Sequence, residues 1–308
     1  MSHHLPAEPA AKDGNLIIRP ARPDDRPAVE RICAHTWEWG DYIPEVWDDW
    51  LADDRAVLQI GEIDGQVVAV NRIVFHSSGQ AWFEGMRVDP ERRRQGIAWQ
   101  FMEHDLALAR ERGAKVVRLA TGDFNTPVHA MVARVGMALI GSEALLAAEA
   151  TPNGPAPAIL GPERSAQVMA FLQHSPALAH MHGLYDCGWA WQTLSAERVT
   201  EMLAAGQMVA LLAPQDELAA LAVVFFEPGW DRMWVGYVDA APGQPEAATA
   251  IAAALRVHAA RLGSPNIEAM LPDLAWLRDA FRAAGYGQGD WKGELWIFER
   301  RFDQDAAD

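Results

Sequence analysis

The sequence has few cysteines and no long hydrophobic run, and both absences narrow its class. Two cysteines, Cys33 and Cys187, stand among 308 residues, too few and too far apart for a disulfide framework or a thiolate metal site. The ten histidines show neither HxxxH nor HExxH spacing, so we expect no metal. No run of about 18 apolar residues could span a bilayer, and the N-terminal segment lacks a signal peptide's apolar core. We therefore expect a soluble cytoplasmic protein without a membrane partner.

Positive charge is scarce as well. The chain has 26 Lys and Arg residues against 42 Asp and Glu residues, which gives a formal net charge of −16. Binding to nucleic acid requires a basic face that neutralises phosphates, so we expect no nucleic-acid partner. Nevertheless, four arginines lie within the eight residues of segment 87–94. This local excess of positive charge suggests a bound anion.

Hydrophobic periodicity in the first half predicts a mixed α/β fold. Residues 1–14 are rich in Pro, Ala and polar side chains, which is typical of a flexible end. Asp64-Gly65 between two apolar runs predicts a hairpin. Strands are predicted at 16–19, 56–63, 66–75, 80–88, 115–121 and 137–141, and helices near 25–33 and at 44–52, 97–113 and 126–136. This order indicates an α/β fold with a mostly antiparallel sheet flanked by helices.

The second half repeats this pattern. Strands are predicted within 204–214, 217–228, 231–240, 266–271 and 293–302, and helices at 245–262 and 273–285. Val88-Asp89 aligns with Val238-Asp239 at an offset of 150 residues, and Gly136-Met137 with Gly285-Tyr286 at an offset of 149. We therefore predict a duplicated domain. The expected boundaries are a first domain at 15–148, a linker at 149–158 and a second domain at 159–308.

The basic segment leads into a predicted helix through small residues. Asp89-Pro90 forms a turn, and Gly96 and Ala98 stand at the helix start. Small residues let the backbone approach a ligand, while the free N–H groups and the dipole of a helix start favour negative charge. A diphosphate suits this position, with Arg92, Arg93 and Arg94 at its rim. The alternative is a solvated basic turn before an ordinary helix.

The same segment carries a family resemblance. Arg93-Arg94-Gln95-Gly96-Ile97-Ala98 matches the R/Q-x-x-G-x-G/A signature of the GNAT superfamily of N-acetyltransferases, and residues 16–141 resemble that family. The preceding "MRVDP" and the distance from Asn125 to Gly136-Met137 are also typical. The resemblance implies two tandem GNAT-like domains and acetyl-CoA as co-substrate, without a metal. It implies cofactor-binding roles for the following residues: Arg93, Arg94, Gln95, Gly96, Ile97 and Ala98 at the pyrophosphate, Met86 and Val88 at the pantetheine, and Asn125 at the thiol end.

Direct acetyl transfer needs a base that receives the proton of the attacking amine. Glu84 lies four residues before Val88, between apolar neighbours that would raise its pKa. The alternative for Glu84 is a structural ion pair. Many family members have a tyrosine general acid where this chain has Val132, and His129, one helical turn earlier, is a substitute candidate whose alternative is an ordinary surface histidine.

The resemblance places the acceptor site in residues 35–51, which are dense in tryptophan and acid. Trp39, Asp41 and Tyr42, on a predicted exposed loop, suit a cationic amine. The stretches 41–51 and 83–88 are similar to the histidine N-acetyltransferase-like branch of the family. That similarity suggests a free amino acid such as histidine as acceptor, with Arg72 as a ligand of its carboxylate.

The second half lacks the arginines and the small-residue pair, and two prolines interrupt its corresponding turn. We therefore predict a degenerate second domain that binds no acyl-CoA. Two other functions stay open: a catalytically silent acyl-CoA-binding sensor, and a transferase that acts on protein N-termini or lysines. The sequence leaves the oligomeric state open.

Overall fold

A computed structural model describes residues 15–34, 36, 40–76, 79–227 and 229–302. The chain divides into two compact units, which are described separately below. Unit 1 comprises Met1–Leu119 and Glu299–Asp308, and unit 2 comprises Ala120–Phe298. Among the described residues, no helix combines the length and the hydropathy that a membrane crossing requires.

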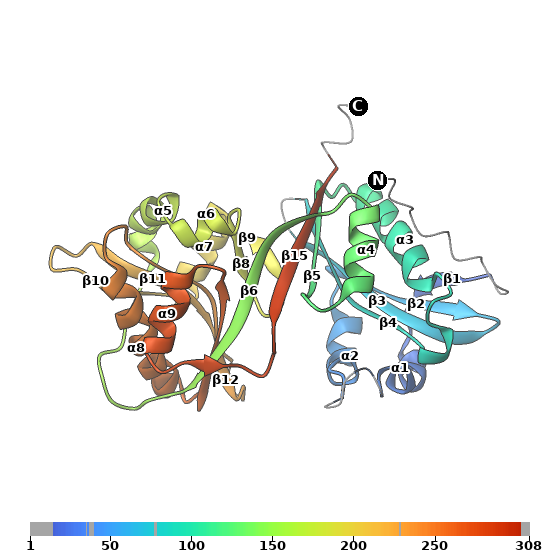
Figure 1. Cartoon of the computed structure of the whole chain (residues 1–308), viewed down its shortest axis with the longest axis horizontal. Coiled ribbons are helices and arrows are strands. Elements are labelled where there is room, and N and C mark those ends of the chain that lie inside the picture. The colour runs from blue at the N-terminus through green and yellow to red at the C-terminus, as the bar shows by residue number, and fades with distance from the viewer. Residues whose placement is uncertain (1–14, 35, 37–39, 77–78, 228, 303–308) are drawn as a thin grey trace, which may run out of the picture. The chain divides into compact units, whose positions relative to one another are not determined.

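Unit 1 is a sheet with helices on both faces (Figure 1). Its elements are β1 (Ile17–Pro20), η1 (Pro23–Asp25), α1 (Arg26–Cys33), α2 (Ile43–Ala52), β2 (Ala56–Ile63), β3 (Gln66–His76), β4 (Gln80–Val88), η2 (Pro90–Arg92), α3 (Ile97–Glu111) and the first part of β5 (Val116–Gly122). Strands β1 to β4 pair antiparallel in chain order, and β5 pairs parallel to β4. The predicted turn between β2 and β3 is confirmed, since Asp64 and Gly65 have φ angles of 51° and 77°.

Two apolar clusters hold the helices of unit 1 on opposite faces of the sheet. On one face Val29 of α1 and Trp47 of α2 pack against Ile60 of β2 and its neighbours. On the other face Phe101 of α3 packs against Ala69 of β3. Neighbouring residues of one strand therefore point to opposite faces of the sheet, as the period of two in the sequence requires.

A β-bulge interrupts β4. Val70 and Arg72 of β3 pair with Arg87 and Glu84, so one residue of β3 stands opposite two residues of β4. Gly85 lies in this bulge with a φ angle of 69°, a conformation that glycine adopts without strain. Because the extra residue shifts the alternation, Glu84 and Arg87 point to the same face, toward α2.

Unit 2 repeats this organisation. Its elements are α4 (Thr126–Arg134), β6 (Ala138–Glu149), β7 (Ala158–Ile159), η3 (Pro162–Arg164), α5 (Ser165–Gln173), α6 (Pro176–His180), β8 (Leu184–Asp186), β9 (Trp191–Thr193), α7 (Ala196–Ala204), β10 (Met208–Leu212), β11 (Leu218–Phe225), β12 (Arg232–Ala240), α8 (Pro245–Leu262), β13 (Asn266–Pro272), α9 (Ala275–Ala283), β14 (Gly287–Gln288) and most of β15 (Glu294–Arg301). Its sheet has the order β15-β6-β13-β12-β11-β10-β7. Strand β12 has a bulge at Gly236 and pairs parallel with β13, as β4 does with β5.

The compact units do not follow the predicted boundaries. The predicted linker, residues 149–158, lies inside unit 2, because β6 pairs with β13 from Glu143 to Glu149. The end of the last strand belongs to unit 1, where Arg118 binds Glu299 at 2.8 Å and the N–H of Phe302 donates to the carbonyl of Lys115. The linker therefore stays a prediction about where the two sequence repeats join.

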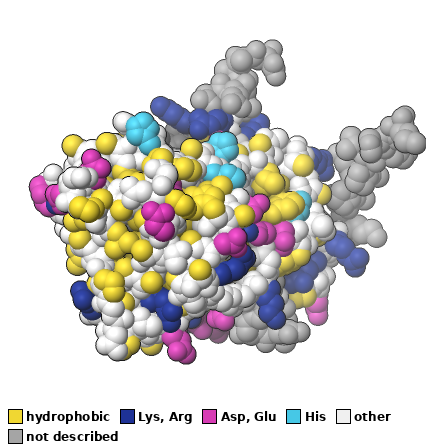
Figure 2. Space-filling view, turned by 60° about the vertical axis from the view of Figure 1, so that its left-hand side comes forward, with side chains coloured by type: hydrophobic (Ala, Val, Ile, Leu, Met, Phe, Trp, Pro, Cys, Tyr) yellow, Lys and Arg dark blue, Asp and Glu magenta, His cyan; other side chains and the backbone are white. Residues whose placement is uncertain are grey.

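Charges on the surface are mixed. On the face seen in Figure 2, acidic and basic side chains are interspersed with hydrophobic ones. Such mixing is ordinary for a globular surface, so the function must be sought in local geometry.

Candidate functional site

The loop between β4 and α3 is preorganised by its own backbone. Asp89 accepts a hydrogen bond from the N–H of Glu91 at 3.0 Å. Arg94 and Gly96 have φ angles of 61° and 80°, which turn the chain into the helix. The first helical bond runs from the N–H of Gln100 to the carbonyl of Gly96 at 3.0 Å. The N–H groups at the beginning of α3 are therefore not used by the helix itself.

Space is available in front of this helix start. A Cβ atom built on Gly96 would meet no atom within 4 Å. Arg93 and Arg94 are exposed, and Nε of Arg93 donates to the carbonyl of Val88 at 3.3 Å. A helix start with an open approach and flanking guanidinium groups is suited to a phosphate ligand.

The end of β4 lies beside the same helix. The registered pairing of β4 with β5 covers only Gln80–Trp82, although β4 continues to Val88. Met86 and Val88 pack against the cluster that holds Ile97 at the start of α3. Among the described residues, the second half of β4 therefore has backbone N–H and C=O groups on its β5 side that no strand pairs with. These groups lie next to the open start of α3, where a ligand could use them.

Glu84 belongs to an ion-paired network on the α2 face of the sheet. Arg72 contacts the carboxylate of Glu84 and donates to Asp53 at 2.5 Å. The indole N–H of Trp82 donates to Glu84 at 3.1 Å, and the guanidinium of Arg72 lies 4.9 Å from the centre of the Trp50 ring. The ion pair that was one of the two interpretations of Glu84 is therefore present. Burial raises the pKa of Glu84, and the charge of Arg72 acts in the opposite direction.

Two of the expected acceptor residues take part in ion pairs. Arg72 is buried and binds Asp53 and Glu84 through its two terminal nitrogens, while its Nε atom has no hydrogen-bond partner among the described residues, so its role as a carboxylate ligand stays a prediction. The side chain of Asp41 is 0% exposed and binds Arg87 at 2.6 Å. Although burial opposes the effect, Arg87 lowers the pKa of Asp41. Asp41 is thus a buried structural carboxylate, because an arginine on the bulged strand lies opposite it.

The other two acceptor candidates have different outcomes. Tyr42 is 46% exposed, with its ring 5.7 Å from the ring of Trp50 in an edge-to-face arrangement. It remains accessible to a ligand. Trp39 lies outside the described residues.

Asn125 and His129 belong to unit 2 and are described there only. Asn125 is the N-cap residue of α4, and its amide donates to the hydroxyl of Thr121 at 2.8 Å. Nε2 of His129 lies 3.0 Å from the carbonyl of Gly122, so this nitrogen carries the proton. The ring stacks on Trp296 at 4.7 Å. His129 is therefore held on two sides and is not the ordinary surface histidine of the alternative interpretation.

A buried polar cluster connects α3 with the sheet of unit 1, and the sequence interpretation missed it. Asp105 is 3% exposed and accepts hydrogen bonds from Gln59 at 2.8 Å and from Asn71 at 2.5 Å. Asn71 stands opposite the bulge of β4. Burial raises the pKa of Asp105 to about 7. The sequence did contain a signal for this cluster, because Asp105 stands among the apolar residues of the predicted helix.

In unit 2 the bulge of β12 is covered, whereas a Cβ atom on Gly243, before α8, would meet no atom within 4 Å, as at Gly96. A Cβ atom on Gly236 would lie 1.8 Å from the carbonyl oxygen of Asp186, so the hairpin of β8 and β9 covers the bulge of β12. Gly243 has a φ angle of 80°, like Gly96, but Pro245 and Glu246 begin α8. Proline removes an N–H group and glutamate places negative charge at the helix start.

Known proteins resemble the chain in part of its sequence and in its fold. Residues 26–137 match the model of the acetyltransferase (GNAT) family. No curated protein sequence matches the chain. Among solved structures, a GCN5-related N-acetyltransferase from Sphaerobacter thermophilus is similar, with a TM-score of 0.64, 16% identity, and coverage of 93% of this chain and 95% of that chain.

Two further structures resemble the chain over most of its length. A tandem GNAT protein from the clavulanic acid biosynthesis pathway has a TM-score of 0.58 and 14% identity, with 93% of this chain and 98% of that chain covered. A GCN5-related N-acetyltransferase from Kribbella flavida has a TM-score of 0.50 and 17% identity, with 96% and 73% covered. At these identities the structures show a common fold. Residues 26–137 therefore match the acetyltransferase (GNAT) family, and the chain as a whole has the fold of a tandem GNAT protein.

Proposed function

We propose that the chain transfers the acetyl group of acetyl-CoA to the amine of a small molecule, and that residues of unit 1 hold the CoA. The observation that carries this proposal is the open start of α3 beside the free edge of β4. Amides of Gly96, Ile97 and Ala98 would bind the pyrophosphate, with Arg93, Arg94 and Gln95 around it. The backbone of Met86 and Val88 would bind the pantetheine. Arg93 would then exchange its bond with the Val88 carbonyl for one with phosphate.

The proposed reaction is a direct transfer. The neutral amine attacks the thioester carbon, an N–C bond forms, and the C–S bond breaks as the CoA thiolate leaves. Backbone N–H groups near the bulge of β4 would stabilise the oxyanion. Glu84 would receive the proton of the amine, for which a raised pKa is an advantage.

The thiolate would leave without a strong acid. Val132, at the position of the family's tyrosine, is buried. His129 is kept as a candidate, but its Nε2 proton is donated to the carbonyl of Gly122. A thiol is acidic enough to leave as its anion.

The acceptor is proposed to be a small amine, and a free amino acid such as histidine remains within that class. Tyr42 is the exposed aromatic side chain proposed to contact it. Unit 2 is proposed to be silent in acyl transfer, because Pro245, Glu246 and the carbonyl of Asp186 oppose binding at its corresponding positions.

Release of free thiol from acetyl-CoA tests the function. The full chain is incubated with acetyl-CoA and a panel of amino acids, polyamines, aminoglycosides and lysine peptides, and thiol is measured over time. We expect amine-dependent release with at least one small amine and formation of the acetylated product by mass spectrometry. CoA binding without thiol release for any acceptor would instead establish a sensor. Release with peptides alone would establish a protein acetyltransferase.

A matched pair of variants tests whether Glu84 acts as the base or only as an ion-pair partner of Arg72. Glu84→Gln and Asp53→Asn each leave Arg72 with one carboxylate. If Glu84 is the base, Glu84→Gln lowers kcat by about 10²–10⁴ and removes the acidic limb of the pH–rate profile, whereas Asp53→Asn does neither. Equal losses in both variants would show that Glu84 acts only through Arg72.

A further inference from the structure

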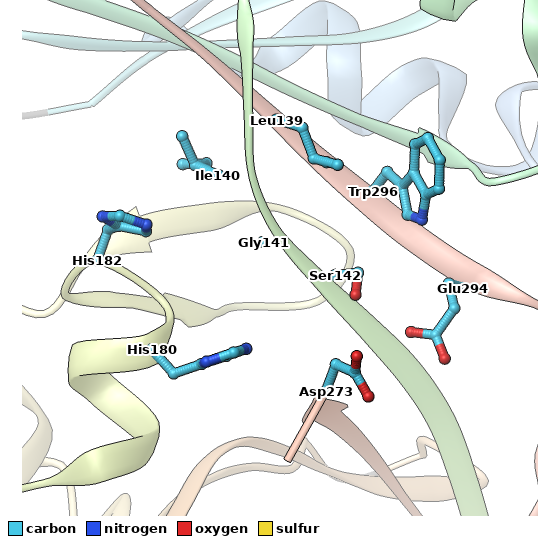
Figure 3. Close-up of a pocket in the computed structure, with 9 residues that line it drawn as sticks. All are labelled: Leu139, Ile140, Gly141, Ser142, His180, His182, Asp273, Glu294 and Trp296. Atoms are coloured by element: carbon cyan, nitrogen blue, oxygen red, sulfur yellow. The ribbon is translucent and has the colours of Figure 1, made fainter. Parts of the chain in front are cut away.

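Unit 2 contains a pocket that the proposed acetyl transfer does not use. Its volume is about 600 Å³, within the range of small-molecule sites. We name it the β6–β15 pocket. It is lined by Leu139, Ile140, Gly141, Ser142, His180, His182, Asp273, Glu294 and Trp296 (Figure 3).

The charge of the β6–β15 pocket is negative. Asp273 and Glu294 line it, and none of its described lining residues is Lys or Arg. Arg278 bridges the two carboxylates: its Nη1 atom lies 3.3 Å from Asp273 and 2.7 Å from Glu294, and its Nη2 atom donates to the other oxygen of Glu294 at 2.8 Å. It is 7% exposed and also donates to the backbone of Leu271 and Pro272. One guanidinium thus faces two carboxylates, and one negative charge remains for a ligand.

An aromatic wall stands next to this charge. Trp296 and Glu294 are two residues apart on β15 and therefore share a face. His129 stacks on the Trp296 ring with an interplanar angle of 14°, which fixes the ring in place. An indole beside a carboxylate is a favourable surface for an alkylammonium group, because the ring attracts the cation and packs against its methylene groups.

The polar groups are spread along the pocket. Figure 3 shows His180 and His182 on one side of Gly141, and Asp273, Glu294 and Trp296 on the other. Among the described residues, no group of three or more His, Cys, Asp or Glu side chains converges to hold a metal ion. This arrangement suits an elongated molecule that runs along the pocket, with its ammonium group at the carboxylates.

We propose that the β6–β15 pocket binds an elongated aliphatic amine in its ammonium form. The ammonium group lies at the exposed carboxylate of Asp273, the methylene chain runs along the pocket and contacts Trp296, and the far end reaches His180 and His182. The binding concerns unit 2 alone and does not rest on the proposed acetyl transfer.

Calorimetry with spermidine tests this proposal on the full chain without CoA. We expect one saturable site. Asp273→Asn is expected to weaken it about tenfold, because a charge-assisted hydrogen bond is lost. Asp273 has a side chain that is 69% exposed, so this substitution should leave the melting temperature unchanged. Trp296→Leu is expected to weaken binding to a similar degree through loss of the aromatic contact.

The control is Glu217→Gln, which removes one negative charge at an exposed position of unit 2 outside the pocket. It should bind spermidine like the original chain. Absence of saturable binding would overturn the proposal. So would equal weakening by Glu217→Gln and Asp273→Asn, or full displacement by Mg²⁺ at the same concentration, since both would reveal only general attraction to an acidic protein.

Discussion

At the scale of single residues, Asp105 shows how an apolar helix face can carry a charge. Asp105 is buried in α3 like Phe101 and Leu106, and its carboxylate accepts hydrogen bonds from two neutral amides, Gln59 and Asn71. Neutral donors stabilise a carboxylate less than an ion pair does, so burial dominates and the pKa rises to about 7. Through Gln59 and Asn71 this acid connects α3 with β2 and β3, and Asn71 stands opposite the bulge of β4.

Asp105 should therefore make stability depend on pH. Its folded-state pKa of about 7 lies above the ordinary value of 3.8, so the folded protein retains a proton that the unfolded chain releases. The contribution of Asp105 is complete below about pH 4 and is lost as the pH rises through 7. Urea unfolding measures this effect in Asp105→Asn. As the pH rises from 4 to 7, the free energy of unfolding of the variant should increase relative to that of the original chain, by up to about 1.4 kcal/mol per pH unit.

The control for this titration is Asp64→Asn, which changes an exposed acid in the β2–β3 turn. Its stability should run parallel to that of the original chain across the same pH range. If Asp105→Asn also ran parallel, the carboxyl would not titrate between the two states.

The sequence predicted on which strand or helix a residue lies better than it predicted which partner its side chain binds. Glycine inside an apolar strand is a general signal of a bulge, and we did not use it at Gly85. Even with that signal, the sequence does not show that the bulge turns Arg87 toward Asp41. Arg72 and Asp53 are 19 residues apart and meet only through the pairing of β2 with β3. Partners of charged groups depend on register and bulges, which hydrophobic periodicity does not encode.

At the scale of elements, the loop from β4 to α3 combines two features that unit 2 keeps only in part. Both helices follow a glycine with a φ angle of 80°, Gly96 before α3 and Gly243 before α8. The first turn of α3 has small and apolar side chains, whereas that of α8 has Pro245 and Glu246. The shape of the turn is thus repeated, and the electrostatic character of the helix start is changed.

Two substitutions at Gly96 can distinguish the effect of backbone strain on CoA affinity from the effect of an added negative charge. Asn and Asp have the same shape and both tolerate a left-handed backbone. We expect Gly96→Asn to retain most of the CoA affinity and Gly96→Asp to bind at least about a hundredfold more weakly than Gly96→Asn, since its carboxylate would face the diphosphate. Calorimetry with CoA at low and high salt measures both, and the gap should narrow with salt. Equal affinities of the two variants would place the diphosphate elsewhere.

Most elements were predictable because their periodicity is strong. The helix predicted at 245–262 and the strand at 80–88 have the predicted limits. The strand predicted at 137–141 continues to Glu149, because its partner β13 extends that far. The hairpin of β8 and β9 was not predicted, since its strands have three residues each and no clear alternation.

At the scale of the whole molecule, the two repeats of the sequence do not coincide with the two compact units, since the end of the second repeat belongs to unit 1. Residues 299–302 complete unit 1 through Arg118, which is 3% exposed and requires a carboxylate to balance its buried charge. Long-range pairing of this kind leaves no local signal in a sequence, which explains why the predicted boundaries and the compact units differ.

Truncation tests this dependence. A chain that ends at Phe298 loses Glu299 and Phe302, whereas a chain that ends at Phe302 keeps both. The shorter chain should lose about 3–5 kcal/mol of stability in unit 1, because the buried charge of Arg118 loses its carboxylate and keeps only the neutral amide of Gln80. Hydrogen exchange followed by mass spectrometry should show faster exchange in β4 and in β5 up to Leu119. Unchanged exchange there would mean that Glu299 is not needed.

The pairing of Arg118 with Glu299 also bears on the order of events during synthesis. Translation delivers the chain from its N-terminus, and domains commonly fold as they emerge from the ribosome. Here the segment with the loop between β4 and α3 emerges early, yet the buried guanidinium of Arg118 meets the carboxylate of Glu299 only after nearly all of unit 2 has been translated. A nascent chain arrested within unit 2 would therefore hold an incomplete unit 1.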